Sequence, residues 1–402
     1  MGKILTLLLS LISSLVITHQ SVLSGPTALK YLGYYAGDMD GPGAFADYTD
    51  EIAPFTNLLY IDHYFTANPL LATQRARDKG MKVVYRISDC LFITAHPYVY
   101  NPALWAPCIP SIQSVVNTGS VAAFYIMDEP YGNGIPKNDL EAAITVVRNQ
   151  FPSIPTLVLE EPGCVQGIAW PVSCSASRPK FAPPANVQWY GLDCYPRGTG
   201  YITPDTAVSE VDFCKARYQQ LKAIYTGYFV AVPDVYDHGD ATRFAPIAAV
   251  QQEWYQYVQS DPQFIAILPF LYPDFTDSGF SFKGARSFPD VIAAHKDIGR
   301  QIMCASDTQE AVCGSNGTTY ASPDLLKCDA LTNTTSTTLA HYGACSTSVL
   351  GDANGDGYVN ILDFNMVVSH FGQTGAAIAG DINNDGIVNI LDFNMVISHF
   401  GQ

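Results

Sequence analysis

The stretch Val121-Ala-Ala-Phe-Tyr-Ile-Met-Asp-Glu-Pro130 is an apolar and aromatic run that ends in two acidic residues. A short run of this kind is typical of a strand buried on both faces in a parallel sheet. Similar runs recur along the chain at intervals of roughly 25 to 41 residues. They span Lys30–Tyr35, Asn57–Ile61, Lys82–Ile87, Thr156–Leu159, Val187–Leu192, Tyr228–Val232 and Phe264–Leu268.

Helical patterns lie between several of these runs, as at Lys137–Gln150 and Ala207–Tyr225. Eight strand–helix units in about 280 residues are typical of a (β/α)8 barrel of the TIM type. We therefore expect an α/β protein in which residues 26–303 form such a barrel and two small modules follow it.

In a barrel of this type the functional site lies at the C-terminal ends of the strands. Acidic and tyrosine residues follow almost every predicted strand, so we expect them to share one rim. Glycoside hydrolysis requires two carboxyl groups, and neighbouring like charges keep one of them protonated near neutral pH. The rim residues are Asp38, Asp62, His63, Tyr64, Arg86, Asp89, Asp128, Glu129, Glu160, Glu161, Asp193, Tyr195, Asp234, Tyr236, Asp237, Tyr272 and Asp274.

This order of strands, with Glu129-Pro130 after the fourth, resembles the large clan of barrel glycosidases, whose fourth strand often ends in Asn-Glu-Pro. The resemblance implies that Glu129 is the acid/base. The chain departs from the pattern, because Asp128 replaces Asn and Asp234 and Asp237 stand where a nucleophilic Glu is expected. Retaining and inverting mechanisms both stay open, with Asp193 or Asp234 as base and Tyr195 as a further candidate.

Asp128 and Glu129 are neighbours, and neighbouring residues on a regular strand point to opposite faces. Only one of the two can then face the barrel axis. We expect the other to hold Arg86 or to cap the next helix.

The sequence contains ten cysteines and no CxxC pair, which favours disulfides over a zinc ribbon or a thioredoxin-like site. Proximity along the barrel predicts the pairs Cys90–Cys108, Cys164–Cys174 and Cys194–Cys214, although sequence alone does not determine connectivity.

The string Val312-Cys-Gly-Ser-Asn-Gly-Thr-Thr-Tyr320 resembles a Kazal domain, which we place at residues 304–346. The resemblance implies the disulfides Cys304–Cys328 and Cys313–Cys345. Two family cysteines that normally pair are absent, and Asp324 stands where one of them is expected. The segment is either a serine protease inhibitor, acting through residues 305–312 with Asp307 near the specificity position, or a structural spacer.

Two twelve-residue segments repeat near the C-terminus, Asp352-Ala-Asn-Gly-Asp-Gly-Tyr-Val-Asn-Ile-Leu-Asp363 and Asp381-Ile-Asn-Asn-Asp-Gly-Ile-Val-Asn-Ile-Leu-Asp392. Oxygen-bearing side chains recur at loop positions 1, 3, 5, 9 and 12, and position 7 offers its backbone carbonyl, as a calcium loop requires. We therefore expect two Ca²⁺ ions, held by Asp352, Asn354, Asp356, Tyr358, Asn360 and Asp363 and by Asp381, Asn383, Asp385, Ile387, Asn389 and Asp392.

Each loop precedes a helical pattern, and no helical pattern precedes it, so residues 347–402 resemble a type I dockerin. The resemblance implies a cohesin-like module on a scaffold protein as the partner. Ile361-Leu362 and Ile390-Leu391 occupy positions that often carry hydroxyl groups in that family. Another surface attachment therefore stays open.

The net charge is −16, which argues against nucleic acid as a partner because phosphate binding requires a basic face. Residues 1–25 are expected to be a signal peptide, since Lys3 precedes an apolar run, Ile4–Ile17, too short to span a membrane.

These features favour a secreted glycoside hydrolase that acts on a polysaccharide and is tethered through its calcium module, with no membrane span after cleavage. The alternatives are a non-catalytic barrel that binds glycan or protein, and a Kazal-type inhibitor carried on a barrel.

Overall fold

The computed structural model describes residues 29–35, 48–63, 66, 68–93, 98–170, 174, 180–196, 208–236, 246–277, 280–345, 349–375 and 378–401. The expected signal peptide and the rim residues Asp38, Tyr64 and Asp237 lie outside these ranges. No helix among the described residues is long and apolar enough to cross a membrane.

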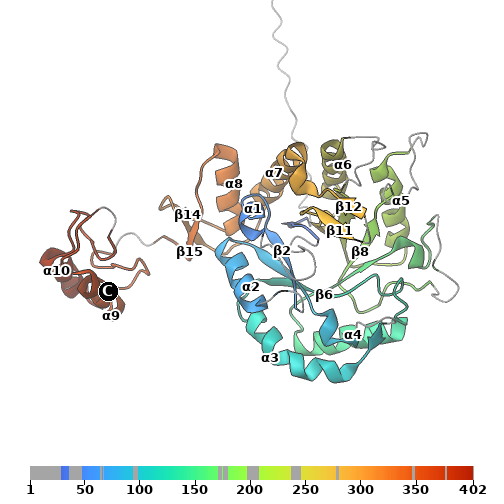
Figure 1. Ribbon diagram of the computed structural model, residues 1–402, viewed down its shortest axis with the longest axis horizontal. Coiled ribbons are helices and arrows are strands. Elements are labelled where there is room, and N and C mark those ends of the chain that lie inside the picture. The colour runs from blue at the N-terminus through green and yellow to red at the C-terminus, as the bar shows by residue number, and fades with distance from the viewer. Residues whose placement is uncertain are drawn as a thin grey trace, which may run out of the picture.

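Eight parallel strands form a nearly closed barrel in the order β1-β10-β9-β8-β7-β6-β3-β2, which confirms the predicted fold class (Figure 1). Every predicted strand is present. The strands are β1 Tyr31–Leu32, β2 Leu58–Asp62, β3 Lys82–Arg86, β6 Val121–Asp128, β7 Thr156–Glu160, β8 Trp189–Cys194, β9 Tyr228–Pro233 and β10 Phe264–Ile267.

Helices surround the barrel, and the predicted helix at 137–150 is found at those bounds. The second predicted helix begins later, at Glu210, because the Ser209 side chain caps it by accepting a hydrogen bond from the Asp212 amide. The barrel helices are α1 Thr49–Ile52, α2 Pro69–Asp78, α3 Trp105–Val116, α4 Lys137–Gln150, α5 Glu210–Lys222, α6 Ile247–Gln259 and α7 Pro289–Cys304.

Short elements complete the loops around this framework. Two antiparallel pairs are β4 Phe92–Ile93 with β5 Val99–Tyr100 and β11 Phe275–Asp277 with β12 Phe280–Phe282. The 3-10 turns are η1 Ser88–Cys90, η2 Pro102–Leu104, η3 Pro162–Cys164 and η4 Ala285–Ser287.

Strands β1 and β2 lie at the two ends of the sheet order and meet at a seam. A Cβ atom on Gly33 would lie 2.4 Å from the Leu58 carbonyl oxygen, so only glycine allows this close approach. The Asn57 amide donates a hydrogen bond of 3.0 Å to the Leu32 carbonyl across the seam.

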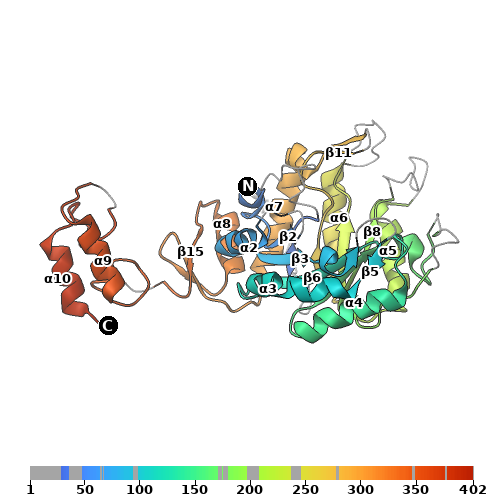
Figure 2. The ribbon, with the colours of Figure 1, turned by 60° about the horizontal axis from the view of Figure 1, so that its bottom comes forward.

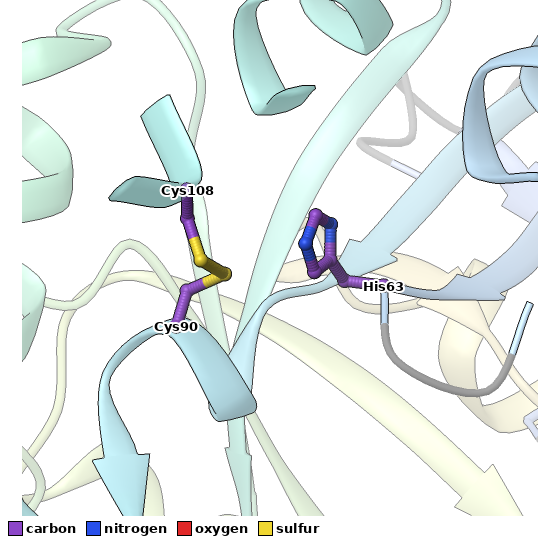
Figure 3. Close-up of side chains that lie close together, drawn as sticks. All are labelled: His63, Cys90 and Cys108. Atoms are coloured by element: carbon purple, nitrogen blue, oxygen red, sulfur yellow. A yellow bond between two sulfur atoms is a disulfide. The ribbon is translucent and has the colours of Figure 1, made fainter. Parts of the chain in front are cut away.

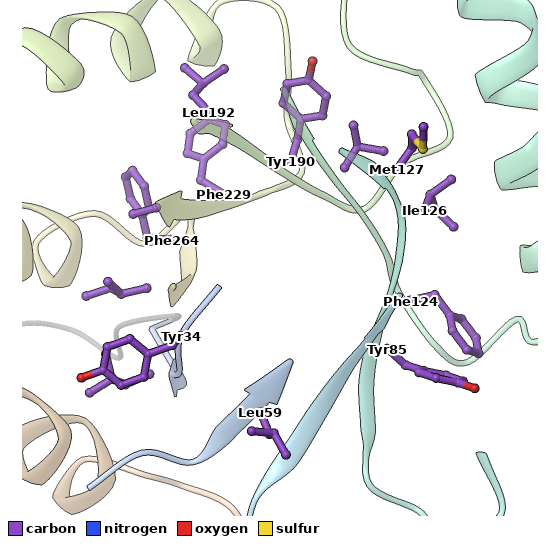
Figure 4. Close-up of a cluster of buried hydrophobic side chains, with 14 of the residues drawn as sticks. Tyr34, Leu59, Tyr85, Phe124, Ile126, Met127, Tyr190, Leu192, Phe229 and Phe264 are labelled. Carbon is purple, nitrogen blue, oxygen red and sulfur yellow. The ribbon is translucent and has the colours of Figure 1, made fainter. Parts of the chain in front are cut away.

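Side chains on the strands alternate between the barrel interior and the layer beneath the helices. The interior is filled by residues such as Tyr60, Val84 and Leu159. The outer layer is the larger core, and Figure 4 shows part of it, including Tyr34, Leu59, Tyr85, Phe124, Ile126, Met127, Tyr190, Leu192, Phe229 and Phe264.

The four-cysteine segment contains the strands β13 Val312–Gly314, β14 Thr319–Tyr320 and β15 Leu339–Tyr342 and the helix α8 Pro323–Asn333. All five predicted disulfides are present, and the described residues include no free cysteine. They join Cys90 to Cys108, Cys164 to Cys174, Cys194 to Cys214, Cys304 to Cys328 and Cys313 to Cys345.

The C-terminal module has one helix after each repeated loop, α9 Ile361–His370 and α10 Ile390–His399, as predicted. Its small core is built from equivalent residues of the two copies, Val359 with Val388 and Val367 with Val396. The module lies apart from the barrel in both ribbon views (Figures 1 and 2).

Candidate active site and calcium loops

Strand β8 places Asp193 and Tyr195 at the mouth of the barrel. Trp189 and Tyr195 belong to the interior cluster, whereas Tyr190, Leu192 and Cys194 face the outer layer, so the intervening Asp193 points inward. Asp193 is buried, and its Oδ1 accepts a hydrogen bond of 3.2 Å from the Tyr195 hydroxyl.

The side chain of Asp128 faces the barrel interior because the pairing of strand β6 with strand β7 is irregular. The register with β7 shifts between Tyr125 and Met127, and both Ile126 and Met127 face the outer layer. Tyr125 and Asp128 therefore share the interior side, and the Tyr125 hydroxyl donates a 2.6 Å hydrogen bond to Asp128 Oδ1.

The expectation that Asp128 or Glu129 holds Arg86 is wrong. The Arg86 guanidinium instead forms an ion pair of 2.9 Å with Asp62, one strand away, and its Nε donates to Ser88. Burial works to lower the Arg86 pKa, but Tyr60 and Asp62 hold it above its ordinary value. This arginine is thus a charged partner for its neighbours inside the barrel.

Glu129 leaves the strand with a φ of 41°, a backbone conformation uncommon for a residue other than glycine and enriched at functional sites. Its backbone is held on both sides, because its N–H donates to the Leu159 carbonyl and its own carbonyl accepts from the Asn133 N–H. Glu129 is half-buried, so it is more accessible than Asp193.

The three carboxylates Asp128, Glu129 and Asp193 interact electrostatically. Burial is the main cause that raises the pKa of Asp193 well above its ordinary range, and repulsion from Asp128 and Glu129 adds to the effect. A buried carboxyl group whose pKa is raised by neighbouring carboxyl groups is typical of sites that perform acid/base chemistry.

Glu160, another predicted rim residue, supports the backbone that follows Glu129. It is fully buried, and its two oxygens accept hydrogen bonds from the amides of Tyr131, Gly132 and Glu161 at 2.9, 3.2 and 3.0 Å. These contacts make Glu160 a positioning residue.

The end of β9 contributes Asp234, which is buried. Its backbone carbonyl accepts a 2.9 Å hydrogen bond from Gln251 on α6. Aromatic rings adjoin this region, since Phe270 stacks on Tyr195 at 5.4 Å and meets Tyr236 edge-on at 5.7 Å. Phe270 was missed by the sequence analysis, although its place two residues beyond the last predicted strand is a usable signal.

Three further tyrosines were also missed because they lie inside predicted strands. The rings of Tyr35, Tyr60 and Tyr125 pack against one another at 5.5 to 5.9 Å, and the Tyr35 hydroxyl lies 3.2 Å from that of Tyr125. Side chains alternate between the two faces of a strand, and which set faces the barrel interior cannot be assigned until the register is known.

His63 lies beside Cys90 and Cys108, and the three side chains are close enough to hold a metal ion (Figure 3). The two sulfur atoms are joined in a disulfide, however, so neither is available as a thiolate ligand. The His63 Nδ1 is engaged by the Tyr85 hydroxyl.

The first C-terminal loop brings three carboxylates together. Asp352, Asp356 and Asp363 each place an oxygen within 4.8 Å of the others. Backbone amides orient them, as Asp352 accepts from Gly355, Asp356 and Gly357. This set of hard oxygen donors fits a calcium ion.

The second loop repeats this organisation. Asp381 accepts from the amides of Asp385 and Gly386, and Asp392 accepts from those of Ile382, Asn383 and Asn389. Asp363 and Asp392 at position 12 are fully buried and complete capping boxes with Asn360 and Asn389.

Two family models match the C-terminal part of the chain. A dockerin type I domain matches residues 350–401, and a Kazal-type serine protease inhibitor domain matches residues 300–345. Dockerin type I domains bind calcium, in agreement with the donor set of the loops. Comparison with curated proteins finds no match.

Solved structures share the barrel fold at low sequence identity. The GH5_18 protein of Streptomyces cattleya, solved with GlcNAc, is 10% identical with a TM-score of 0.51, covering 71% of this chain and 82% of its own. A Rhizomucor miehei beta-1,3-glucanosyltransferase is 11% identical with a TM-score of 0.41, covering 61% of this chain and 88% of its own.

The beta-D-glucuronidase of Dictyoglomus thermophilum is 13% identical with a TM-score of 0.46, and the match covers 68% of this chain. The chain spans only 50% of that longer protein. The protein thus combines a barrel with a fold found among glycoside hydrolases, a Kazal-type segment and a dockerin type I module.

Proposed function

We propose that the barrel is a glycoside hydrolase that cleaves a polysaccharide by carboxylate acid/base catalysis. The observation that carries this proposal is the raised pKa of the buried Asp193 beside Asp128 and Glu129. Hydrolysis of a glycosidic bond requires one carboxyl group that carries a proton and one that does not, and the raised pKa of Asp193 beside two further carboxyl groups suits this division of roles.

Glu129 and Asp193 are the proposed pair, and Asp234 is the alternative second carboxylate. The charges of Asp128 and Glu129 raise the pKa of Asp193, so a change at Glu129 is expected to affect Asp193 as well. Glu129 is the more accessible member and occupies the position of the acid/base in the glycosidases that the sequence resembles. Tyr195 orients Asp193 through its hydrogen bond.

The aromatic rings of Tyr195, Tyr236 and Phe270 support a sugar substrate. Their mutual contacts form an aromatic patch beside the carboxylates. Aromatic faces pack against the apolar C–H surface of a sugar ring, while a tyrosine hydroxyl also offers a hydrogen bond.

The test is hydrolysis of cellulose, chitosan and polygalacturonate by the full chain, measured as released reducing ends. Glu129→Gln and Asp193→Asn are each expected to lower the rate by about 100-fold or more, since an essential acid or base typically contributes that factor. Glu141→Gln is the control, because Glu141 lies on α4, where it forms an ion pair with Lys137 and accepts a hydrogen bond from the Ala185 amide.

Aryl glycosides with activated leaving groups separate the two roles. The leaving group of such a substrate needs no protonation, so the variant that lacks the acid retains its activity on it, whereas the variant that lacks the base or nucleophile does not. Activity of both variants at the wild-type rate on every substrate would contradict the assignment. A chain that is retained on a polysaccharide without cleaving it would instead be a glycan-binding barrel.

We further propose that the protein is extracellular and is attached to a scaffold through its dockerin module with two bound calcium ions. The ten disulfide-bonded cysteines support an oxidising compartment. Ile361 and Leu362 are 55% and 58% exposed, and Ile390 and Leu391 in the second copy are 55% and 53% exposed. This paired apolar surface supports a cohesin-like or other apolar partner rather than a charged one.

Binding of the isolated cohesin modules of a scaffold, followed by calorimetry with and without calcium, tests the attachment. Replacing Ile361, Leu362, Ile390 and Leu391 together by serine is expected to abolish binding while leaving hydrolysis intact. Unchanged binding would show that a different face of the module is used.

A further inference from the structure

The four-cysteine segment packs against the end of the barrel opposite the candidate active site. Lys327 on α8 is buried there, and its Nζ donates a 2.8 Å hydrogen bond to the Thr56 carbonyl just before β2. Helix α8 also lies alongside α7, the last helix of the barrel (Figures 1 and 2). The segment therefore covers the N-terminal ends of the first strands.

Asn57 is the residue that joins the two sides of the barrel seam. Its backbone N–H and side-chain Oδ1 form a reciprocal pair with Leu32, at 3.0 and 2.9 Å, and its Nδ2 donates to the Lys30 carbonyl at 2.8 Å. The same Nδ2 donates to Asp324 Oδ1 at 3.1 Å. The α8 carboxylate thus completes the hydrogen bonding of the seam.

Asp324 occupies a position at which the Kazal resemblance leads us to expect a cysteine. Its second oxygen, Oδ2, accepts a 2.7 Å hydrogen bond from the hydroxyl of Ser306, which lies in the 305–312 loop. A carboxylate therefore links that loop, helix α8 and the barrel, where a cysteine would link only two parts of the segment.

We propose that this four-cysteine segment serves as the closing element of the barrel, with Asp324 holding the Asn57 seam, and that it does not act as a protease inhibitor. The 305–312 loop supports this role because its two acidic side chains form ion pairs with lysines of the barrel. Asp307 lies 3.5 Å from Lys30, and Glu310 lies 3.1 Å from Lys82.

Strand β15 of the four-cysteine segment also contacts the barrel, at helix α2. The Tyr342 hydroxyl donates a 2.9 Å hydrogen bond to the Arg77 carbonyl, and the Arg77 guanidinium lies 4.2 Å from the centre of the Tyr342 ring. Exposed ion pairs such as Lys30–Asp307 contribute little free energy, so the coupling rests on the more buried contacts of Asp324, Lys327 and Tyr342.

The test uses the full chain and tryptophan fluorescence. All four tryptophans, at positions 105, 170, 189 and 254, belong to the barrel, so their signal reports barrel unfolding while the substitutions lie in the other segment. Asp324→Ala is expected to lower the midpoint of this thermal transition by roughly 3–6 °C, and Asp324→Asn by less.

Asp329→Ala is the matched control. Asp329 lies on the same helix, but its hydrogen bonds to described residues are accepted from Tyr320 and Asn333, within the segment. Its replacement is expected to leave the barrel midpoint close to that of the wild type. Equal shifts for the two alanine variants would overturn the proposal, because they would show a general effect of the segment rather than a seam contact.

A double-mutant cycle with Asn57→Ala makes the claim specific. The midpoint of the thermal transition is expected to fall by less in the double variant than the sum of the two single shifts, since either change removes the same contact. Strict additivity would overturn the proposal. Stoichiometric inhibition of trypsin or elastase by the intact chain would also overturn it, and neither readout depends on hydrolase activity.

Discussion

The hydroxyl of Tyr125 donates a hydrogen bond of 2.6 Å to Asp128 Oδ1, three residues further along the same strand. Residues three apart on a regular strand point to opposite faces, so this contact exists only because the strand is irregular between them. The bulge therefore determines which of the two adjacent acids, Asp128 or Glu129, faces the barrel axis.

Tyr125→Phe is expected to destabilise the folded chain by about 1–3 kcal/mol, because it removes a hydrogen bond to a carboxylate inside the barrel. The measurement is unfolding in guanidinium chloride. Tyr190→Phe is the control, since the buried Tyr190 hydroxyl has no hydrogen-bond partner among the described residues and its loss should be neutral or slightly stabilising. Equal destabilisation by both changes would contradict the assigned role of the hydrogen bond.

Asp193→Asn is expected to stabilise the protein near neutral pH while lowering hydrolysis. The pKa of Asp193 is raised, chiefly by burial, so the folded chain binds this proton more tightly than the unfolded chain does. Its contribution to stability is complete below the ordinary aspartate pKa and is lost as the pH rises through the raised value.

The increase in unfolding free energy caused by Asp193→Asn should therefore be of the order of 1 kcal/mol or more at pH 8 and vanish near pH 3. Thermal unfolding across this pH range measures it. A gain that grows as the pH falls would show that the sign of the shift is wrong.

Each calcium loop is expected to bind one ion independently of the other. Asp363→Ala removes a carboxylate of the first loop and one of the two hydrogen bonds of the capping box of α9, and Asp392→Ala does the same for the second loop and α10. Equilibrium dialysis should find one calcium ion lost in each single variant and both lost in the double variant. Loss of both ions in a single variant would show that the loops fold as one unit.

Calcium removal should destabilise the module because the carboxylates gathered within a loop then repel one another. Losing one hydrogen bond of the capping box typically costs about 1 kcal/mol, so the single variants should be less stable than the wild type even in excess chelator. Circular dichroism of the full chain with and without chelator checks this expectation.

Lys327 should make the stability of the chain depend on pH in the alkaline range. Burial lowers its pKa from 10.5 to about 7, an effect that Asp324 partly opposes. The unfolded chain then binds this proton more tightly than the folded one, so stability rises between about pH 7 and 10.5. The lysine also lines a cavity of about 400 Å³ with Asp50, Asp78 and Lys79.

Lys327→Met is expected to flatten this rise, because the substituted side chain does not titrate. The measurement is the difference in unfolding free energy between variant and wild type at pH 7 and pH 10. Lys82→Met is the control at the same junction, since Lys82 remains about one-third exposed and its charge stays solvated. If the unfolding free energy of Lys327→Met rises between pH 7 and pH 10 as much as that of the wild type, Lys327 is not the cause of the rise.

Much of the architecture was predictable because it depends on patterns among residues that are close together in the sequence. Apolar runs identified all eight barrel strands, and a 3.6-residue pattern located the helix at 137–150 to the residue. The two C-terminal loops were equally visible, since the expected calcium ligands of each loop lie within twelve consecutive residues. The disulfides followed from proximity along the chain or from a family resemblance.

The candidate active site was predictable only as a list of residues at one rim. A single bulge in β6 reverses the side to which Asp128 points, and no local sequence pattern predicts this bulge. Arg86 likewise pairs with Asp62 rather than with Asp128 or Glu129, because β2 and not β6 places its carboxylate beside the guanidinium.

The sequence by itself therefore determined the elements, the calcium loops and the residues available for chemistry, because these depend on spacings of a few residues. The tertiary structure alone decided which carboxylates lie close enough to interact and which segment packs against the barrel seam. Asp324 and Asn57 are separated by 267 residues, and their contact depends on how helix α8 packs against the seam between β1 and β2. Such a contact follows from the packing of whole elements, which local periodicity does not specify.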